Sequence, residues 1–135
     1  MHIRQTKSTD FEVFVPAHHD ILEAKEMGIT PAFPEASECV TMDLHGCPLA
    51  IGGTHGDQVW FVTSDQVWRL NRALKLRFHR LIVEYRNEVL KVYPVIWNYV
   101  WIGNIPHIRF LKSIGAEFHG DYTCDGKFQL FTIRR

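Results

Sequence analysis

The sequence predicts one α/β domain spanning residues 1–135, a mixed α+β sheet of about six or seven strands with about three or four helices. Segments with strand and helix periodicity alternate along the chain, which is typical of this class. The apolar run 95–102 has the length of a strand buried on both faces, and it leads directly into a short amphipathic helix. The chain is 46% apolar, which is sufficient for one hydrophobic core.

The first half of the chain is expected to hold short elements separated by turn residues. Ser8 or Thr9 can cap the first helix, and Asp20 can cap the second, with two histidines at its entry. Gly28 then ends the second helix, and prolines follow in a loop. In order, we expect a strand over 3–6, helices over 8–14 and 20–27, a loop over 30–34, a hairpin of strands 39–44 and 48–51, and a strand over 59–63.

The second half is expected to hold the longest helix, a buried strand and a closing hairpin. Apolar residues recur at helical spacing over 71–93. Pro106 suits the first turn of the following helix, and Gly115 suits its C-terminal end. The pair Asp125-Gly126 predicts a tight turn. The expected elements are a helix over 71–93, a strand over 95–102, a helix ending at 115, and strands over 118–122 and 128–133.

The region around the buried strand resembles the GNAT family, the Gcn5-related N-acetyltransferases. In that family the fifth strand ends near an asparagine, and the next helix runs to a glycine and an aromatic residue, an outline that Asn104, Gly115 and Phe118 match. The passage from 3–6 into a helix and the segment 48–53 also resemble GNAT elements. The resemblance implies an acyl-CoA N-acyltransferase fold. Where the family's chemistry is kept, it also implies acetyl transfer from acetyl-CoA to an amine.

A closer resemblance is to small proteins of short-tailed, T-odd-like phages that are described as internal virion or morphogenesis proteins. It implies a role by contact in virion assembly or host takeover, with a phage structural protein or a host protein as partner. Such a protein acts in the host cytoplasm or in association with the virion. The segments that carry this resemblance are TKSTDFEVF, PAHHDILEAK, ASECVT, DQVWFVTSDQVWRL and WNYVW.

The loop that holds the cofactor's pyrophosphate in GNAT enzymes departs here from the family pattern. That pattern is Gln or Arg, two residues, Gly, one residue, then Gly or Ala, because glycines let backbone N–H groups approach phosphate. When Gln66 is aligned with the first position, Arg69 and Asn71 stand where the glycines belong. Asp65 beside them would repel a pyrophosphate. Arg69 and Arg72 could compensate by pairing with phosphate, so a modified acetyl-CoA site stays open.

The catalytic residues of the family are also incompletely matched. Many GNAT enzymes place a tyrosine acid on the helix after the asparagine, and the matching position here is Leu111, which cannot donate a proton. The resemblance points to His55 and Asp57 as candidate bases in the segment GGTHGD, although such a segment is also typical of a plain turn. The candidate contacts with acetyl-CoA are Val62, Thr63, Arg69, Arg72 and Asn104.

Charge and composition argue against several other classes of function. Fifteen basic and fifteen acidic residues balance, so nucleic acid is not an expected partner, and we interpret the basic row over 69–86 as a solvated helix face. No apolar run reaches the length of a membrane span, so no membrane contact is expected. The histidines and cysteines lack paired ligand spacing, so we expect no metal site and reduced thiols. Among the tryptophans, Trp68 is the one suited to contact a partner.

Two hypotheses from different classes follow. In the first, a GNAT-like phage protein with degenerate acetyl-CoA motifs acts by contact and catalyses nothing. In the second, it is an active acetyl-CoA-dependent N-acetyltransferase that acts on an unidentified amine. The departures at Arg69, Asn71 and Leu111 favour the first hypothesis. An exposed Trp68 would support it, whereas an open wedge between the two central strands would support the second.

Overall fold

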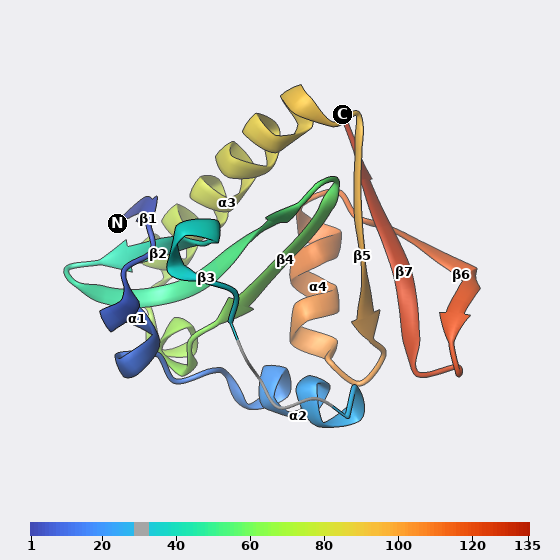
Figure 1. Cartoon of the computed structure of the whole chain (residues 1–135), viewed down its shortest axis with the longest axis horizontal. Coiled ribbons are helices and arrows are strands. Elements are labelled where there is room, and N and C mark those ends of the chain that lie inside the picture. Colours follow the sequence, from blue (N-terminus) through green and yellow to red (C-terminus); the bar gives the residue numbers. More distant parts are fainter. Residues whose placement is uncertain (29–32) are drawn as a thin grey trace.

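A seven-stranded mixed sheet organises the protein (Figure 1). The structure is a computed structural model that describes residues 1–28 and 33–135. The strands are β1 (His2–Gln5), β2 (Val40–Leu44), β3 (Cys47–His55), β4 (Gln58–Thr63), β5 (Val95–Trp101), β6 (Glu117–Cys124) and β7 (Phe128–Arg134). They lie in the order β1-β2-β3-β4-β5-β7-β6, and neighbours are antiparallel except β4 and β5, which are parallel.

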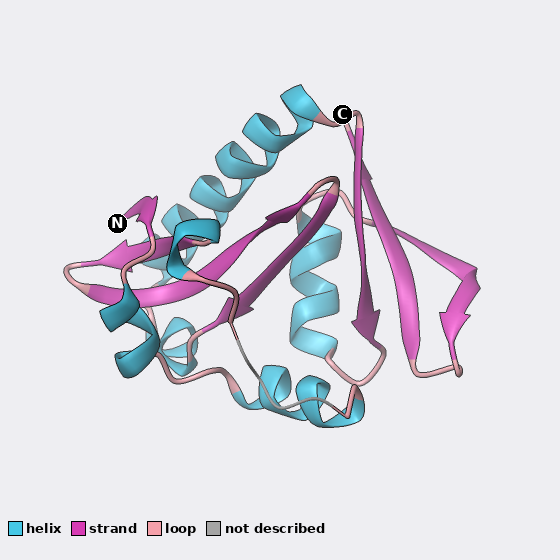
Figure 2. Ribbon diagram, viewed as in Figure 1, coloured by secondary structure: helices cyan, strands magenta, loops and turns pink. Residues whose placement is uncertain are grey.

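Helices cover both faces of this sheet (Figure 2). They are α1 (Ser8–Val13), α2 (His18–Glu26), α3 (Arg72–Val92) and α4 (Ile105–Ser113), with short 3-10 helices η1 (Ala36–Glu38) and η2 (Asp65–Arg69). The predicted mixed α/β class and the predicted order of elements are therefore confirmed. None of the helices within the described ranges is long and apolar enough to cross a membrane.

The buried side chains form three clusters that follow the two faces of the sheet. Successive strand residues point to opposite faces, so Ala50 packs toward α3 and Ile51 toward α1. On the α3 face the core is divided into two clusters, one beneath β2 and β3 and one beneath β5 and β7. The larger cluster holds Leu90, Ile96, Val100, Leu111, Ile114, Phe131 and Ile133.

The largest difference from the predicted elements is the length of β3, which was expected over 48–51 and continues through the segment GGTH to His55. Two glycines lie inside the strand because neighbouring backbone approaches them closely. A Cβ on Gly52 would lie 2.6 Å from the carbonyl oxygen of Trp60, and a Cβ on Gly53 would lie 2.8 Å from that of Glu38. The turn itself falls at Gly56, whose φ is +61°.

Two helices begin differently from the prediction. The α1 helix follows Lys7, whose backbone N–H donates to the Asp10 carboxylate at 2.8 Å, so the predicted hydroxyl caps are not used. The α2 helix follows Ala17 and starts two residues before Asp20, whose side chain is held by other elements. The predicted loop over 30–34 lies partly outside the described residues.

A buried ion-pair network joins β1, α1 and β2. The Arg4 guanidinium donates to both oxygens of Asp10, at 2.8 and 2.9 Å, and to Asp43 at 3.1 Å. Thr41 also donates to Asp10, at 3.1 Å, and the two carboxyl residues are only 4% and 5% exposed. The hydrogen bonds from Arg4 outweigh the effect of burial and lower the pKa of Asp10 to about 2.

We expect Asp10→Asn to lower the free energy of unfolding at pH 7 by roughly 3 kcal/mol, because it leaves Arg4 with an incomplete set of buried partners. The pKa of folded Asp10 lies near 2, below its ordinary value. The contribution of the ionised carboxylate to the free energy of unfolding is therefore complete above the ordinary pKa and is lost as the pH falls toward 2. The variant should therefore be closer to wild type at pH 3 in urea unfolding. An equal loss at both pH values, or the same loss in the exposed control Asp121→Asn, would contradict this account.

Candidate functional site

The strands β4 and β5 diverge as soon as they meet. Within the described chain they share one pair, Gln58 with Trp97, and both then continue unpaired with each other to Thr63 and Trp101. Figure 1 shows the two strands separating toward α2. We call the gap between their diverging ends the strand wedge. The open wedge expected of an acyltransferase is therefore present in the backbone.

The open end of the strand wedge is closed by the protein's own chain. The closing segment, residues 15–23, runs along the end of β4 and into α2. The Ala17 N–H donates to the Thr63 carbonyl at 2.8 Å, and the Asp65 N–H donates to the Val15 carbonyl at 3.0 Å. The edge of β4 that faces the wedge is thus already paired at the position where a bound ligand could extend the sheet.

The Asp20 carboxylate binds donors from both sides of the wedge. One oxygen accepts from the Thr63 backbone N–H at 3.0 Å and from the Thr63 hydroxyl at 2.9 Å. The other accepts from the Asn104 side chain at 3.0 Å and lies 3.6 Å from the Nδ1 of His107. Burial by itself would raise the pKa of Asp20, but the interactions with His107, Asn104 and the Thr63 N–H outweigh it and lower that pKa.

Glu23 accepts a hydrogen bond from the corresponding backbone N–H at the end of β5. Its carboxylate accepts from the Trp101 backbone N–H at 2.8 Å. Burial raises the pKa of Glu23, and the hydrogen bond from Trp101 offsets this only in part. The closing segment therefore places one carboxylate at the end of each diverging strand, Asp20 at β4 and Glu23 at β5.

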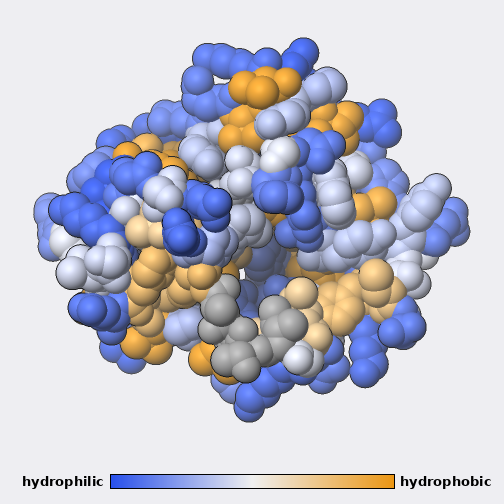
Figure 3. Space-filling view, in the orientation of Figure 1, coloured by the Kyte–Doolittle hydropathy of each residue, from blue (hydrophilic) through white to orange (hydrophobic). Residues whose placement is uncertain are grey.

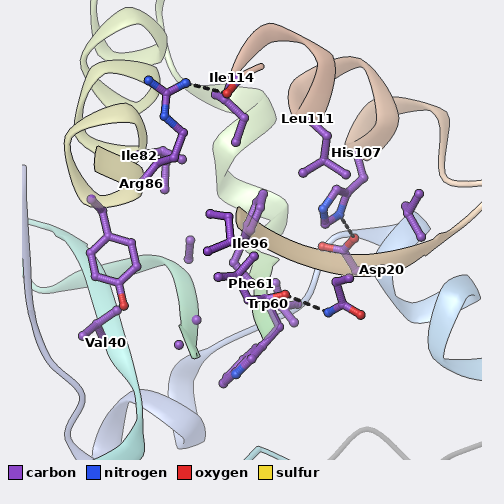
Figure 4. A pocket seen from close by; sticks show the side chains of 18 of the residues that line it. Asp20, Val40, Trp60, Phe61, Ile82, Arg86, Ile96, His107, Leu111 and Ile114 are labelled. Carbon is purple, nitrogen blue, oxygen red and sulfur yellow. Dashed lines mark hydrogen bonds and ion pairs between the residues drawn. The ribbon is translucent and has the colours of Figure 1, made fainter. Parts of the chain in front are cut away.

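A cavity of about 440 Å³ remains inside the strand wedge. The space-filling view shows a hollow at this place on the molecule (Figure 3). Its walls are mainly apolar, with Phe61, Ile82 and Ile96 among them. Figure 4 shows the contact of Asp20 with His107 on one side of the cavity and the hydrogen bond from Arg86 to the Ile114 carbonyl on another. The cavity therefore reaches into the hydrophobic core, and Asp20 and His107 lie at its border.

The β4–α3 junction, where a GNAT enzyme would hold pyrophosphate, is capped by its own side chains. The Ser64 hydroxyl accepts from the Gln66 N–H at 2.9 Å, and the side-chain Oδ1 of Asn71 accepts from the Leu74 N–H at 2.9 Å. Between them lies the 3-10 helix η2, in place of a glycine-rich loop. At least two backbone donors that could approach a phosphate are thus engaged.

The structure brings three of the predicted cofactor contacts, Thr63, Arg72 and Asn104, to the lining of one pocket between α3 and α4, and Val62 and Arg69 lie outside that lining. Thr63 and Asn104 meet at the Asp20 carboxylate. Val62 is paired with Ile51 of β3, and the exposed Arg69 and Arg72 lie at the end of η2 and the start of α3. The candidate acid position, Leu111, is 1% exposed and belongs to the core.

The candidate bases His55 and Asp57 lie at the narrow end of the wedge. His55 is the last residue of β3 and Asp57 lies in the turn before β4, at the opposite end of β5 from Asn104. Asp57 accepts from the Trp97 indole N–H at 2.9 Å, and its carbonyl accepts from the Trp97 backbone N–H at 3.2 Å. These contacts give Asp57 a role in joining β4 to β5, and the assignment of either residue as a base stays a prediction.

The residues that sequence reasoning missed are Glu23 and His107, together with the true role of Asp20. The sequence offered Asp20 only as a helix cap, since its partners Thr63 and Asn104 lie 43 and 84 positions further along the chain. No local spacing could have joined them. The one available signal was the spacing of Asp20 and Glu23, which lie one helical turn apart and so face the same side of α2.

Comparison with known proteins identifies the family. The family model described as "Bacteriophage T7, probable scaffold protein Gp13" matches residues 38–123. The "Probable scaffold protein gp13" of Escherichia phage T7 is 68% identical over 135 residues, which cover 100% of this chain and 98% of the phage T7 protein. The chain belongs to the Gp13 family. The expected likeness to a morphogenesis protein of T-odd-like phages is thereby confirmed.

Solved structures assign the GNAT fold to this member of the Gp13 family. An acetyltransferase from Agrobacterium tumefaciens str. C58 superposes with a TM-score of 0.68 at 14% identity, over 98% of this chain and 90% of that one. The enzyme AAC(6')-Ib, solved with an aminoglycoside and acetyl-CoA, gives 0.63 at 15% identity, over 99% and 93%. A GNAT-family acetyltransferase from Bacillus anthracis gives 0.62 at 14% identity, over 98% and 93%. At such identities the likeness concerns the fold alone.

We expect Glu23→Gln to change the pH dependence of stability. Because the pKa of folded Glu23 is raised, the wild type should lose stability as the pH rises from the ordinary glutamate value through the raised one. A glutamine can still accept from the Trp101 N–H without carrying a buried charge. Urea unfolding should therefore show the variant gaining stability relative to wild type between pH 4 and pH 7.5.

The matched control for this change is Glu84→Gln, which alters an exposed glutamate on α3. The control should shift stability equally at both pH values. A constant difference between Glu23→Gln and wild type across the range would contradict the described burial of Glu23.

Proposed function

We propose that this protein acts by contact during assembly of the phage particle, as an accessory or scaffold-type protein that performs no acyl transfer. The phage T7 relative, which is named a probable scaffold protein, supports the assembly role. The partners would be structural proteins of the virion or a host protein, met in the host cytoplasm or in the assembling particle. On this proposal the GNAT-like sheet serves as a rigid support for binding surfaces.

The observation that carries the proposal is the closure of the strand wedge by Asp20 and Glu23. An acyl-CoA bound as in the GNAT family would need the backbone donors at the ends of β4 and β5. Here those donors are hydrogen-bonded to the partly buried carboxylates of Asp20 and Glu23. Hydrogen bonds to charged groups contribute about 1.5–3 kcal/mol each, so a thioester ligand would have to displace the bonds that Asp20 and Glu23 accept from the N–H groups of Thr63 and Trp101.

Further features support the same conclusion. The junction between β4 and α3 lacks glycines, and the side chains of Ser64 and Asn71 cap it. Leu111 at the position of the family's acid offers no proton. Trp68, by contrast, is 57% exposed, as expected of a residue that contacts a partner.

The divergence of β4 and β5 favours a second candidate, an acetyl-CoA-dependent N-acetyltransferase with an unidentified amine as acceptor. In that case Val62, Thr63 and Asn104 would contact the acetyl-CoA arm once the closing segment had moved. The guanidinium groups of Arg69 and Arg72 would pair with phosphate, and His55 or Asp57 would serve as base. This function requires the Asp20 contacts to break before the cofactor binds.

Thermal unfolding in the presence of acetyl-CoA separates the two candidates. We expect no change in the unfolding midpoint up to millimolar acetyl-CoA, because the donors in the wedge are occupied. A ligand that binds only the folded state would stabilise it by about 2.7 kcal/mol at a hundredfold excess over its dissociation constant. Desulfo-CoA and ATP are the controls, and a rise specific to acetyl-CoA would overturn the contact proposal.

Complementation of a phage that lacks this gene tests the candidate bases directly. We expect the double variant His55→Ala with Asp57→Asn to support the same yield of particles as wild type, since the asparagine can still accept from the Trp97 indole. A loss of yield by a variant whose unfolding midpoint is unchanged would point to a catalytic base instead.

A further inference from the structure

We infer that a groove on the outer side of the closed wedge docks an acidic segment, carrying an aromatic or large aliphatic side chain, from another protein of the virion. This inference rests on the proposed contact function. The groove lies between the first halves of α3 and α4, beside η2, and has a volume of about 590 Å³. We call it the basic groove, and its lining includes Trp68, Arg72, Lys75, Leu76, Pro106 and Arg109.

The walls of the basic groove are fixed before any partner arrives. The Phe110 ring of α4 packs against Phe78 of α3 and Phe61 of β4, with ring centroids 5.8 and 5.7 Å apart. The His79 Nε2 lies 3.1 Å from the Ser113 hydroxyl, which joins α3 to α4 a second time. A preformed groove costs little conformational entropy on binding, and its volume is within the range of ordinary binding sites.

Large apolar side chains stand exposed in the lining of the basic groove. Trp68 is 57% exposed and Leu76 is 61% exposed. Pro106, from α4, adds a further nonpolar residue to the lining. Tryptophan is among the residues that contribute most to protein interfaces when a partner covers it. This lining therefore suits an apolar anchor residue of the partner.

Positive charge surrounds that apolar lining. Arg72 and Lys75 come from α3 and Arg109 from α4, and all three are exposed. None of them has an ion-pair partner within residues 1–28 and 33–135. The whole chain has no net formal charge, so this excess is local to the groove. Charge complementarity then favours carboxylates on the partner, placed beside its anchor residue.

A protein segment fits these features better than a phosphate-rich ligand. Asp20 lies at the inner end of the groove, and its carboxylate repels an anion that reaches toward the wedge. Along α3, acidic residues follow at Glu84 and Glu88, so the exposed cations do not continue as the long stripe that a nucleic acid requires. A peptide whose carboxylates pair with Arg72 and Arg109 at the outer rim, with an apolar side chain between them, keeps its charges away from Asp20. It also needs no long stripe of cations.

The test uses short overlapping peptides that cover the virion proteins of the phage, with binding to the full-length protein measured by fluorescence anisotropy. We expect the tightest peptides to carry two or more carboxylates beside an aromatic or large aliphatic residue. Replacing their acids by amides, or the apolar residue by alanine, should weaken binding. Single-stranded DNA and CoA are measured in parallel as ligands of the alternative classes.

Matched variants of the protein locate the binding surface. The charge reversal Arg72→Glu with Lys75→Glu should lower peptide affinity by about tenfold or more, as should Trp68→Ala. The control Arg77→Glu with Arg80→Glu makes the same change of charge on exposed residues of α3 outside the groove and should leave affinity within about twofold. Thermal unfolding midpoints confirm that each variant remains folded.

Specific results would overturn the inference. The inference fails if no peptide binds, or if the peptides that bind most tightly carry no acidic residues. It also fails if the groove variants and the control variant lose peptide affinity equally, or if the groove variants weaken the binding of DNA or CoA and leave peptide binding unchanged. The acetyl-CoA titration reports separately on the contact function. If acetyl-CoA fails to bind and no peptide binds, the groove inference fails alone, whereas acetyl-CoA binding removes the proposed function as well.

Discussion

The Asp20 carboxylate joins parts of the protein that would otherwise separate at the open end of the strand wedge. It binds Thr63 at the end of β4 and Asn104 and His107 at the start of α4, so a single side chain bridges the two diverging halves of the sheet. The direct hydrogen bonds between β4 and β5 lie at the narrow end of the wedge, where Trp97 and Asn98 contact Asp57, Gln58 and Val59. The contacts of Asp20 therefore fix the first turn of α4 against the end of β4, and core packing and the hydrogen bonds from α3 hold the rest of the helix.

The same interaction changes the end of the wedge where a GNAT enzyme would use backbone donors. In the GNAT arrangement the diverging strands expose backbone donors that a cofactor can use. Here Asp20 and Glu23 accept from two of those donors, the N–H groups of Thr63 and Trp101, and buried donors left without partners would be costly. On the contact proposal, such a closure leaves no need for a phosphate loop or a proton donor. The basic groove then offers a surface between α3 and α4 for contact with a partner.

Local sequence patterns were sufficient wherever an element is determined by its own residues. The 21-residue helix α3 and the strand β5 follow from apolar periodicity and from an unbroken apolar run. The length of β3 could not be predicted in this way. Gly52 and Gly53 suit a strand here for a tertiary reason, because the carbonyl oxygens of Trp60 and Glu38 approach them too closely for a side chain. Asp20 was assigned to a helix cap for a related reason, since its actual partners are distant in sequence.

The sequence by itself determined the fold class, the order of the elements and the membership of the GNAT-like scaffold, because these depend on periodicity and on short motifs. It also indicated that Arg69, Asn71 and Leu111 interrupt the family's chemistry. Only the tertiary structure decided that the wedge is closed, because that closure depends on carboxylates in α2 meeting donors in β4, β5 and α4. It alone also placed the unpaired cations of α3 and α4 around one groove, since residues on two helices become neighbours only when the helices pack.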